Sequence, residues 1–514
     1  MKRFALVVLI AVAGTFAALS VASPNAQAGV FGGKKSSGTP TPSPSPSALP
    51  TATPEPPSVA IPRLQAKLKA NPNDQQAMLE LAAEFLQIGK PNLTLELTQH
   101  LLQQGDKSAQ VYYYDGFAQG QLGNLPGAIA DLEQASNLDP TNMTVLAQLA
   151  DMYLRSNRPT DAERVAKRAV TFNKTEPTAL EALGSVYAAE QKYDDARTEF
   201  EAALALNPKD PSAIFQIAST YMDQNNIPLA LQSIDRALAL DPKSVEALAF
   251  KASLYAKQHD DAKTSEAYDD AVVAATTDDV KVQLMLNKAS YFLGERKTTE
   301  GQAVLQQIVT QYPHVSAGFV AYGNFYAQQR QYSQAQTQWQ AALAIDPDDP
   351  GALLGLGEIS MQQGHATDTI NYLKHYTQVS PDAQGFALLG QAYSMTHDFN
   401  NMKDACTKSF AIQREPATLS CIAGADFELR NYKEAAQIFD VLDKAAKDFV
   451  DRDPQLLFMA AKTYQNANQC GKSQEAYKRL LAIPGLKTQA PTQYSAVQKA
   501  MAEPCGQPAK KKSS

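Results

Sequence analysis

The chain contains one helix-and-turn segment twice. Residues 193–211 read YDDARTEFEAALALNPKDP, and residues 332–350 read YSQAQTQWQAALAIDPDDP. A proline recurs at one constant interval, as from Pro208 to Pro242 and from Pro313 to Pro347. The separation of Pro242 from Pro313 is slightly more than two such intervals, which indicates a short insertion in an otherwise regular series. Self-similarity at a period of about 34 residues predicts a tandem array of small structural units.

Each period has the pattern of two amphipathic helices joined by a polar turn. In the period that begins at Pro177, one apolar stripe consists of Leu180, Leu183, Gly184 and Tyr187, and a second consists of Ala196, Phe200 and Ala203. Both stripes have the spacing of an α-helix. The stretch EQKYDD separates them, and the residue before Pro208 is disfavoured in the α conformation, which ends the second helix. Asp210 and Asp349, each placed before a proline, are predicted N-caps.

The pattern L-x-x-L-G-x-x-Y, followed by A-x-x-x-F-x-x-A and a proline, resembles the tetratricopeptide (TPR) repeat family. The resemblance covers residues 74–484 as twelve units, of which the last two have altered spacing. It implies an all-α fold, an α-α superhelical solenoid of about twelve TPR helix-turn-helix units with capping helices, over residues 61–502. PRLQAKLKANP before the first unit and TQYSAVQKAMAEP after the last are the predicted caps. Trp339 takes the station of Phe200, so we expect it in the core.

Residues 1–28 have the pattern of a signal peptide. Lys2 and Arg3 precede an apolar run over residues 4–22, and Ala26-Gln27-Ala28 matches a signal-peptidase site. We therefore expect a periplasmic or secreted protein. The alternative is an uncleaved inner-membrane anchor, since residues 4–22 could cross a thin bilayer.

The segments that flank the array have biased compositions. Residues 29–60 are rich in Pro, Ser and Thr and predict a disordered, extended linker, which could act as a tether. Residues 503–514 are predicted to be a disordered basic tail.

The chain has four cysteines, and an oxidising compartment would favour their pairing. Four thiols allow three pairings, so the connectivity is open at the level of sequence. We favour Cys470 with Cys505, which would fix the C-terminal end, and Cys406 with Cys421, from one repeat helix to the next. None of them has the CxxC spacing of a metal site, so we predict no bound metal.

The sequence contains no recognisable catalytic motif. The six histidines are scattered along the array, and we find no HExxH, GxSxG or dinucleotide motif. NANQCGKS, residues 466–473, ends like a phosphate-binding loop, but no predicted strand precedes it and its first position is Asn. The net charge of −7 is unlike that of a general nucleic-acid binder. We predict a protein that is not an enzyme, with no cofactor, no small-molecule substrate and no nucleic-acid partner.

The family resemblance implies that the first helix of each unit lines a surface that takes up partner segments, with its second, fifth, ninth and twelfth positions exposed. The predicted partner-binding residues are Tyr113, Phe117, Asp151, Glu181, Phe215, Met222, Glu246, Asn324 and Glu358. Across the first nine units none of these positions holds Lys or Arg, so the carboxylate clamp of chaperone-binding TPR domains is absent. We expect neutral to mildly basic segments, with Tyr113, Phe117, Phe215 and Met222 as anchors. The alternative is that these are ordinary exposed apolar residues.

The resulting functional hypothesis is a non-enzymatic protein-interaction scaffold or adaptor of the cell envelope. Membrane contact would then occur only through the N-terminal segment, if that segment is not cleaved. The alternative is a structural subunit or assembly factor of a membrane-associated secretion or polysaccharide-export complex, tethered by the Pro-rich linker.

Overall fold

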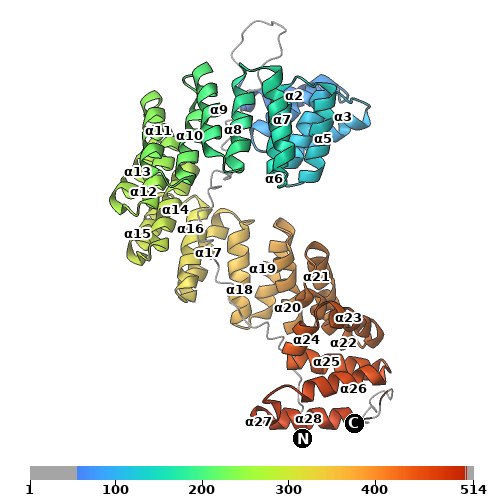
Figure 1. Cartoon of the computed structure of the whole chain (residues 1–514). Coiled ribbons are helices and arrows are strands. Elements are labelled where there is room, and N and C mark those ends of the chain that lie inside the picture. The colour runs from blue at the N-terminus through green and yellow to red at the C-terminus, as the bar shows by residue number, and fades with distance from the viewer. Residues whose placement is uncertain (1–54, 504, 506–514) are drawn as a thin grey trace. The chain divides into compact units, whose positions relative to one another are not determined.

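The computed structural model describes residues 55–503 and 505, without the side chains of residues 488 and 489. The predicted signal peptide, nearly all of the predicted linker, and the tail after residue 505 lie outside these residues. Within them the regular structure consists entirely of α-helices, labelled α1 to α28 in Figure 1. The predicted all-α solenoid is confirmed.

Twelve antiparallel hairpins make up most of the described chain. Their first helices are α2 (Gln75–Gln87), α4 (Ala109–Gln121), α6 (Met143–Arg155), α8 (Pro177–Ala189), α10 (Pro211–Asp223), α12 (Val245–Lys257), α14 (Asp278–Gly294), α16 (Ser316–Gln328), α18 (Pro350–Gln362), α20 (Ala383–Met395), α22 (Pro416–Glu428) and α25 (Pro454–Asn466). Their second helices are α3 (Pro91–Gln103), α5 (Leu125–Leu138), α7 (Pro159–Phe172), α9 (Tyr193–Leu206), α11 (Ile227–Leu240), α13 (Asp261–Ala274), α15 (Thr298–Gln311), α17 (Tyr332–Ile345), α19 (Ala366–Val379), α21 (Phe399–Ile412), α23 (Tyr432–Ala445) and α26 (Cys470–Leu481). The remaining helices are α1 (Pro57–Ala70), α24 (Lys447–Arg452), α27 (Leu486–Gln489) and α28 (Pro491–Ala502).

The described chain divides into two compact units, one that ends at Leu284 and one that begins at Met285. In both units each hairpin packs against the next, as α8 and α9 pack on one another and α7 packs on α8 (Figure 1). The core of each unit is a series of apolar clusters between neighbouring helices. No hairpin buries both of its apolar stripes alone, so the stacking of neighbours supplies the core.

One residue in each hairpin turn has a left-handed backbone. These residues are Gly89, Gly123, Asn157, Gln191, Asn225, His259, Arg296, Arg330, Gly364, His397, Arg430 and Asn468. After such a residue the chain reverses while the last carbonyls of the first helix are still satisfied. The N–H of Gln191 donates to Ala188 O at 2.9 Å, and the N–H of the following residue, Lys192, donates to Tyr187 O at 2.8 Å. These paired bonds end the helix and begin the turn.

Short polar side chains fix many of the helix starts. The Asp210 carboxylate accepts a hydrogen bond from the Ser212 N–H at 2.9 Å, and Asp349 accepts one from the Ala352 N–H at 3.1 Å. Both predicted N-caps are therefore confirmed, and each is followed by a proline at the first helical position.

Small residues let the helices approach closely. A Cβ on Gly184 would lie 2.6 Å from the ring of Phe200, and one on Gly355 would lie 2.6 Å from the ring of Trp339. The alanines at one station of the second helices, Ala128, Ala162, Ala196, Ala230 and Ala335, are fully buried. Trp339 is 1% exposed, which confirms its predicted place in the core.

The two ends of the array differ from the regular pattern. The N-terminal capping helix α1 begins at Pro57, slightly before the predicted start of the solenoid at residue 61. The C-terminal cap is α28, preceded by the short helix α27. The short helix α24 lies between the last two hairpins, which explains the altered spacing there.

The cysteines are joined as Cys406–Cys421 and Cys470–Cys505, with Cα atoms 6.2 and 5.8 Å apart. This is the pairing that the sequence analysis favoured. The first bond joins α21 to α22, and the second joins the start of α26 to the chain after α28. Each disulfide therefore fixes one helix of the C-terminal unit to a neighbouring segment.

Candidate protein-interaction surface

The second, fifth, ninth and twelfth positions of the first helices are here called the first-helix face. Six of the predicted partner-binding residues on it are half-buried: Tyr113, Phe117, Glu181, Phe215, Asn324 and Glu358. Asp151 and Glu246 are exposed. Half-burial of this kind leaves part of a side chain open while its neighbours fix its position.

Met222 corrects the predicted set. It is 9% exposed and belongs to the core cluster that contains Ile214, Ile217 and Ala218. The unbranched thioether chain folds onto these apolar neighbours, which its flexibility permits. Met222 is therefore a core residue, and its predicted role as an exposed anchor is wrong.

Aromatic rings gather on α4. The rings of Tyr113 and Phe117 are stacked with centroids 6.1 Å apart, and the ring of Tyr114 lies 5.3 Å from that of Tyr113. Burial, and to a smaller degree Tyr114, raises the pKa of Tyr113, so its hydroxyl stays protonated near neutral pH. This cluster offers flat, partly accessible aromatic area, a common composition for an interface.

A second aromatic contact lies further along the same unit. The half-buried ring of Phe215 on α10 is tilted against that of Phe250 on α12, with centroids 6.2 Å apart. Phe250 is 3% exposed and forms part of the core. Phe215 is thus supported by a core residue of the next hairpin, while the rest of its ring is accessible.

Two acidic residues of the first-helix face, Glu181 and Glu358, are half-buried and have raised pKa values. Glu181 accepts a hydrogen bond from Ser212 Oγ at 3.1 Å, which links α8 to α10. Burial raises the pKa of Glu181 to about 7, and the nearby Asp210 carboxylate adds to the effect. Burial also raises the pKa of Glu358 on α18. A basic group brought by a partner would favour the ionised form of both carboxyls.

Glu246 and Asn324 are positioned in different ways. Ser244 Oγ donates to Glu246 Oε2 at 3.4 Å at the start of α12. The indole N–H of Trp339 donates to Asn324 Oδ1 at 3.1 Å. A core side chain therefore sets the orientation of this half-buried amide on the first-helix face.

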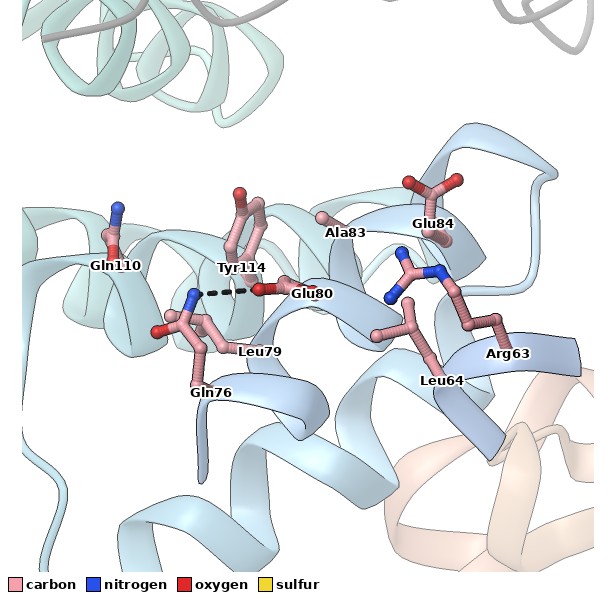
Figure 2. A pocket seen from close by; sticks show the side chains of 9 residues that line it. All are labelled: Arg63, Leu64, Gln76, Leu79, Glu80, Ala83, Glu84, Gln110 and Tyr114. Carbon is pink, nitrogen blue, oxygen red and sulfur yellow. Dashed lines mark hydrogen bonds between the residues drawn. The ribbon is translucent and has the colours of Figure 1, made fainter. Parts of the chain in front are cut away.

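A pocket of about 200 Å³ opens at the start of the N-terminal unit, between α1, α2 and α4 (Figure 2). It is lined by Arg63, Leu64, Gln76, Leu79, Glu80, Ala83, Glu84, Gln110 and Tyr114. Gln76 Nε2 donates to Glu80 Oε1 at 3.0 Å, the bond drawn as a dashed line. Gln76, Leu79, Ala83 and Gln110 occupy positions of the first-helix face, so the pocket belongs to the same surface as Tyr113 and Phe117.

The C-terminal unit has a corresponding pocket of about 250 Å³ between its first helices α14 and α16. Its lining consists of Leu286, Ala289, Ser290, Leu293, Leu305, Ala321, Asn324, Phe325 and Gln328. Asn324 is the one residue here that the sequence analysis selected as a site residue. The lining is mostly apolar, unlike that of the N-terminal pocket.

The remaining sequence candidates lie apart from one another. His259 and His397 take the left-handed turn positions, and residues 466–473 run from the end of α25 into α26 as a helix-connecting turn. Over the described part of the chain, no group of three or more His, Cys, Asp or Glu side chains is placed to hold a metal ion. No helix among residues 55–503 combines the length and hydrophobicity that crossing a membrane requires.

Comparisons with family models gave three matches. Residues 143–246 match the C-terminal ARM domain of tetratricopeptide repeat protein 21, residues 215–279 match a tetratricopeptide repeat model, and residues 323–364 match a TPR repeat model. A search of curated protein sequences gave no significant match. The three models support assignment of the repeats to the tetratricopeptide repeat family.

Solved structures of other repeat proteins are similar over parts of the chain. A thermophilic TPR protein from Thermus thermophilus is 22% identical, with 35% of this chain and 98% of that one covered and a TM-score of 0.33. The APC/C hetero-tetramer Cut9-Hcn1 is 15% identical, with 87% and 93% covered and a TM-score of 0.33. YrrB, described as a TPR protein with an unusual peptide-binding site, is 22% identical, with 36% and 95% covered and a TM-score of 0.28.

Proposed function

We propose that this tetratricopeptide-repeat chain is a non-enzymatic scaffold that holds segments of partner proteins along its first-helix face. Proteins of this repeat family generally bind peptide or protein partners, and the family models match residues in both units. The scaffold would act through shape and side-chain complementarity and would catalyse no reaction.

The observation that carries the proposal is the position of the two pockets. Each borders two successive first helices, α2 and α4 in one unit and α14 and α16 in the other, and each lining includes residues at the predicted exposed positions. In the N-terminal unit the aromatic cluster of Tyr113 and Phe117 adjoins the pocket, since the ring of Tyr114 in the pocket lining lies 5.3 Å from that of Tyr113. Pockets with neighbouring aromatic rings provide the desolvated sites in which interface anchors contribute most.

The charge of the face supports a neutral to mildly basic partner segment. Asp151 and Glu246 are exposed, and Glu181 and Glu358 are half-buried with raised pKa values. A like-charged acidic segment would add repulsion to the existing cost of burying these carboxyls. A segment that carries Lys or Arg would reduce that cost.

We also propose that the scaffold acts in the cell envelope. The support is the signal-peptide pattern of residues 1–28 and the two disulfides, which suit an oxidising compartment. The Pro-rich composition of residues 29–60 favours the second candidate, a tethered structural subunit or assembly factor of a membrane-associated export complex. A soluble mature chain that begins at Gly29 would favour the scaffold, and retention of residues 1–28 in the membrane fraction would favour the tethered subunit.

Site-specific photo-crosslinking in the native host tests the scaffold directly. A photoreactive amino acid at Phe215 is expected to form covalent adducts with one or a few partner proteins, which mass spectrometry of the products would identify. The matched control is the same amino acid at Gln232, an exposed residue of the second helix α11. Equal adducts at both positions would contradict the assignment of the first-helix face.

A further inference from the structure

We propose that the pocket between α1, α2 and α4 receives a lysine side chain of the bound partner segment. The inference rests on the proposed function and adds the chemistry of one subsite to it. Four features of the pocket support it: a half-buried carboxylate with one buried, unsatisfied oxygen, a second carboxylate on the same helix, apolar walls, and continuity with the aromatic cluster of α4.

The first feature is Glu84. Its Oε2 atom is buried and has no hydrogen-bond partner among the described residues. Burial raises the pKa of this carboxyl, and the charges of Glu55 and Glu80 act in the same direction while Arg63 opposes them. A buried carboxylate oxygen without a donor is costly, and a donor that enters with a positive charge removes the cost most effectively.

The second feature is the arrangement of charges around Glu84. Glu80 also lines the pocket, one helical turn away on α2 (Figure 2). The one basic residue in the lining, Arg63, is already paired with Glu55, with Nε 2.9 Å from Oε2. The lining therefore holds two carboxyls and one guanidinium, and the Nε atom of that guanidinium is paired with Glu55, which lies outside the lining.

The walls fit the rest of a lysine side chain. Leu64, Leu79 and Ala83 supply apolar surface, and the pocket has room for a flexible stem, at about 200 Å³. A lysine combines a compact ammonium with a four-carbon stem, whereas arginine needs a planar, forked set of acceptors. Tyr114 forms the wall toward α4, and the nearby Glu84 charge adds to the effect of burial in raising the Tyr114 pKa.

The pocket adjoins the aromatic cluster of α4, so a single partner segment can contact both. The ring of Tyr114, in the pocket wall, lies 5.3 Å from the ring of Tyr113, which is itself stacked on Phe117. A segment whose apolar residue contacts Tyr113 and Phe117 can thus place a neighbouring lysine in the pocket. We expect a fixed spacing between that lysine and the apolar residue.

A random dodecapeptide library displayed on phage tests the subsite before any natural partner has been identified. Selection on the wild-type protein should enrich a lysine at a constant distance from an aromatic or aliphatic residue. A different result is a set of selected peptides whose binding depends on Tyr113 and Phe117 but which carry no basic residue, or only arginine. That result would overturn the lysine assignment and leave the proposed function standing. Failure to enrich any peptide would contradict the proposed function and this inference together.

The selected peptide then allows a double-mutant cycle, with affinities from fluorescence anisotropy. Replacing its lysine by norleucine should weaken binding to the wild-type protein by about tenfold or more, the size expected for a charged hydrogen bond. The same replacement should weaken binding to Glu84→Gln by a clearly smaller factor, because only the Glu80 carboxyl remains in the lining to pair with the ammonium. Equal losses on both proteins would overturn the pairing with Glu84.

The matched control is Glu96→Gln on α3, the second helix of the same hairpin, where the side chain is exposed. This variant has the same change in net charge as Glu84→Gln and should keep the full tenfold response. Circular dichroism and the thermal midpoint of both variants check that the array is folded. If Glu96→Gln lost the response as well, the effect would be one of net charge and the subsite would be rejected.

Discussion

The indole N–H of Trp339 donates a hydrogen bond to Oδ1 of Asn324 at 3.1 Å. Trp339 is 1% exposed and belongs to the second helix α17, whereas Asn324 is half-buried on the first-helix face of α16. The bond shows how the two helices of a hairpin divide their roles. The second helix supplies the core, and a core side chain sets the orientation of a residue at the predicted binding surface.

Replacing Gly355 by Ala should destabilise the C-terminal unit by about 1–3 kcal/mol. The added Cβ would lie 2.6 Å from the Trp339 ring, and an aromatic ring in a packed core cannot bend away as a flexible chain can. Trp339 is the only tryptophan of the chain, so its fluorescence during urea unfolding reports on this unit. The control is Gly294→Ala at the end of α14, where an added Cβ meets no atom within 4 Å; a similar loss there would refute the steric explanation.

Replacing Gln191 by Gly should stabilise the N-terminal unit by about 0.5–1 kcal/mol. Gln191 has a φ of 62°, a left-handed conformation that side chains with a Cβ disfavour and that glycine accepts without strain. The reverse change at the equivalent turn, Gly123→Ala, should destabilise by about the same amount, because its φ is 85°. Thermal midpoints from circular dichroism measure both. Shifts of the same sign in the two variants would contradict the prediction.

Replacing Asp131 by Asn should remove a pH-dependent loss of stability. Burial, together with the adjacent Asp115 carboxyl, raises the pKa of Asp131 from 3.8 to about 7. Gln119 Nε2 donates to both carboxyls at 2.5 Å, and Asp115 is 3% exposed. Because the folded state holds the proton more tightly than the unfolded state, the contribution of Asp131 is fully present below about pH 4 and is lost as the pH rises through about 7.

The measurement is the difference in unfolding free energy between wild type and Asp131→Asn from pH 4 to pH 8. Since Asp131 is half-buried, we expect the variant to be more stable by about 1–2 kcal/mol at pH 8, with little difference at pH 4. Other carboxyls with raised pKa values are present in both proteins and cancel in the difference. A difference that is constant with pH would contradict the raised pKa.

Phe215→Ser and Met222→Ser should have different consequences, although the sequence analysis grouped the two residues. Phe215 is partly accessible, so its replacement should reduce partner capture with a small change in thermal midpoint. Met222 is 9% exposed in a core cluster, so its replacement should destabilise the protein by about 2–4 kcal/mol. Capture after photo-crosslinking at a neighbouring position, together with circular dichroism, separates the two. If Phe215→Ser captured partner normally, its role as an anchor would be excluded.

Much of the fold could be predicted from the sequence because one pattern is repeated. The apolar stripes, the proline stops and the small residues each recur at a fixed station, so each unit supports the interpretation of the others. Trp339 could be placed in the core from its station alone. The left-handed turn residues were harder to predict, since Gln191 and Arg330 occupy positions where glycine would be the expected residue.

The site was less predictable. The exposure of a side chain depends on its neighbours in space, and its position within the repeat unit does not specify these. Met222 takes an exposed station but folds into the core. Glu84 and Tyr114 lie outside the four stations of the first-helix face, yet they line the N-terminal pocket. The pocket forms where α2 meets α1, a single helix instead of a hairpin, so the regular repeat does not predict which side chains remain open there.

Hydrogen exchange measured by mass spectrometry, with and without the partner segment identified by crosslinking, tests most directly whether partners bind along the first helices. We predict slower exchange on binding in the first helices α4, α8 and α10, with the second helices α5, α9 and α11 nearly unchanged. Slower exchange confined to the second helices, or spread equally over both, would contradict binding along the first-helix face.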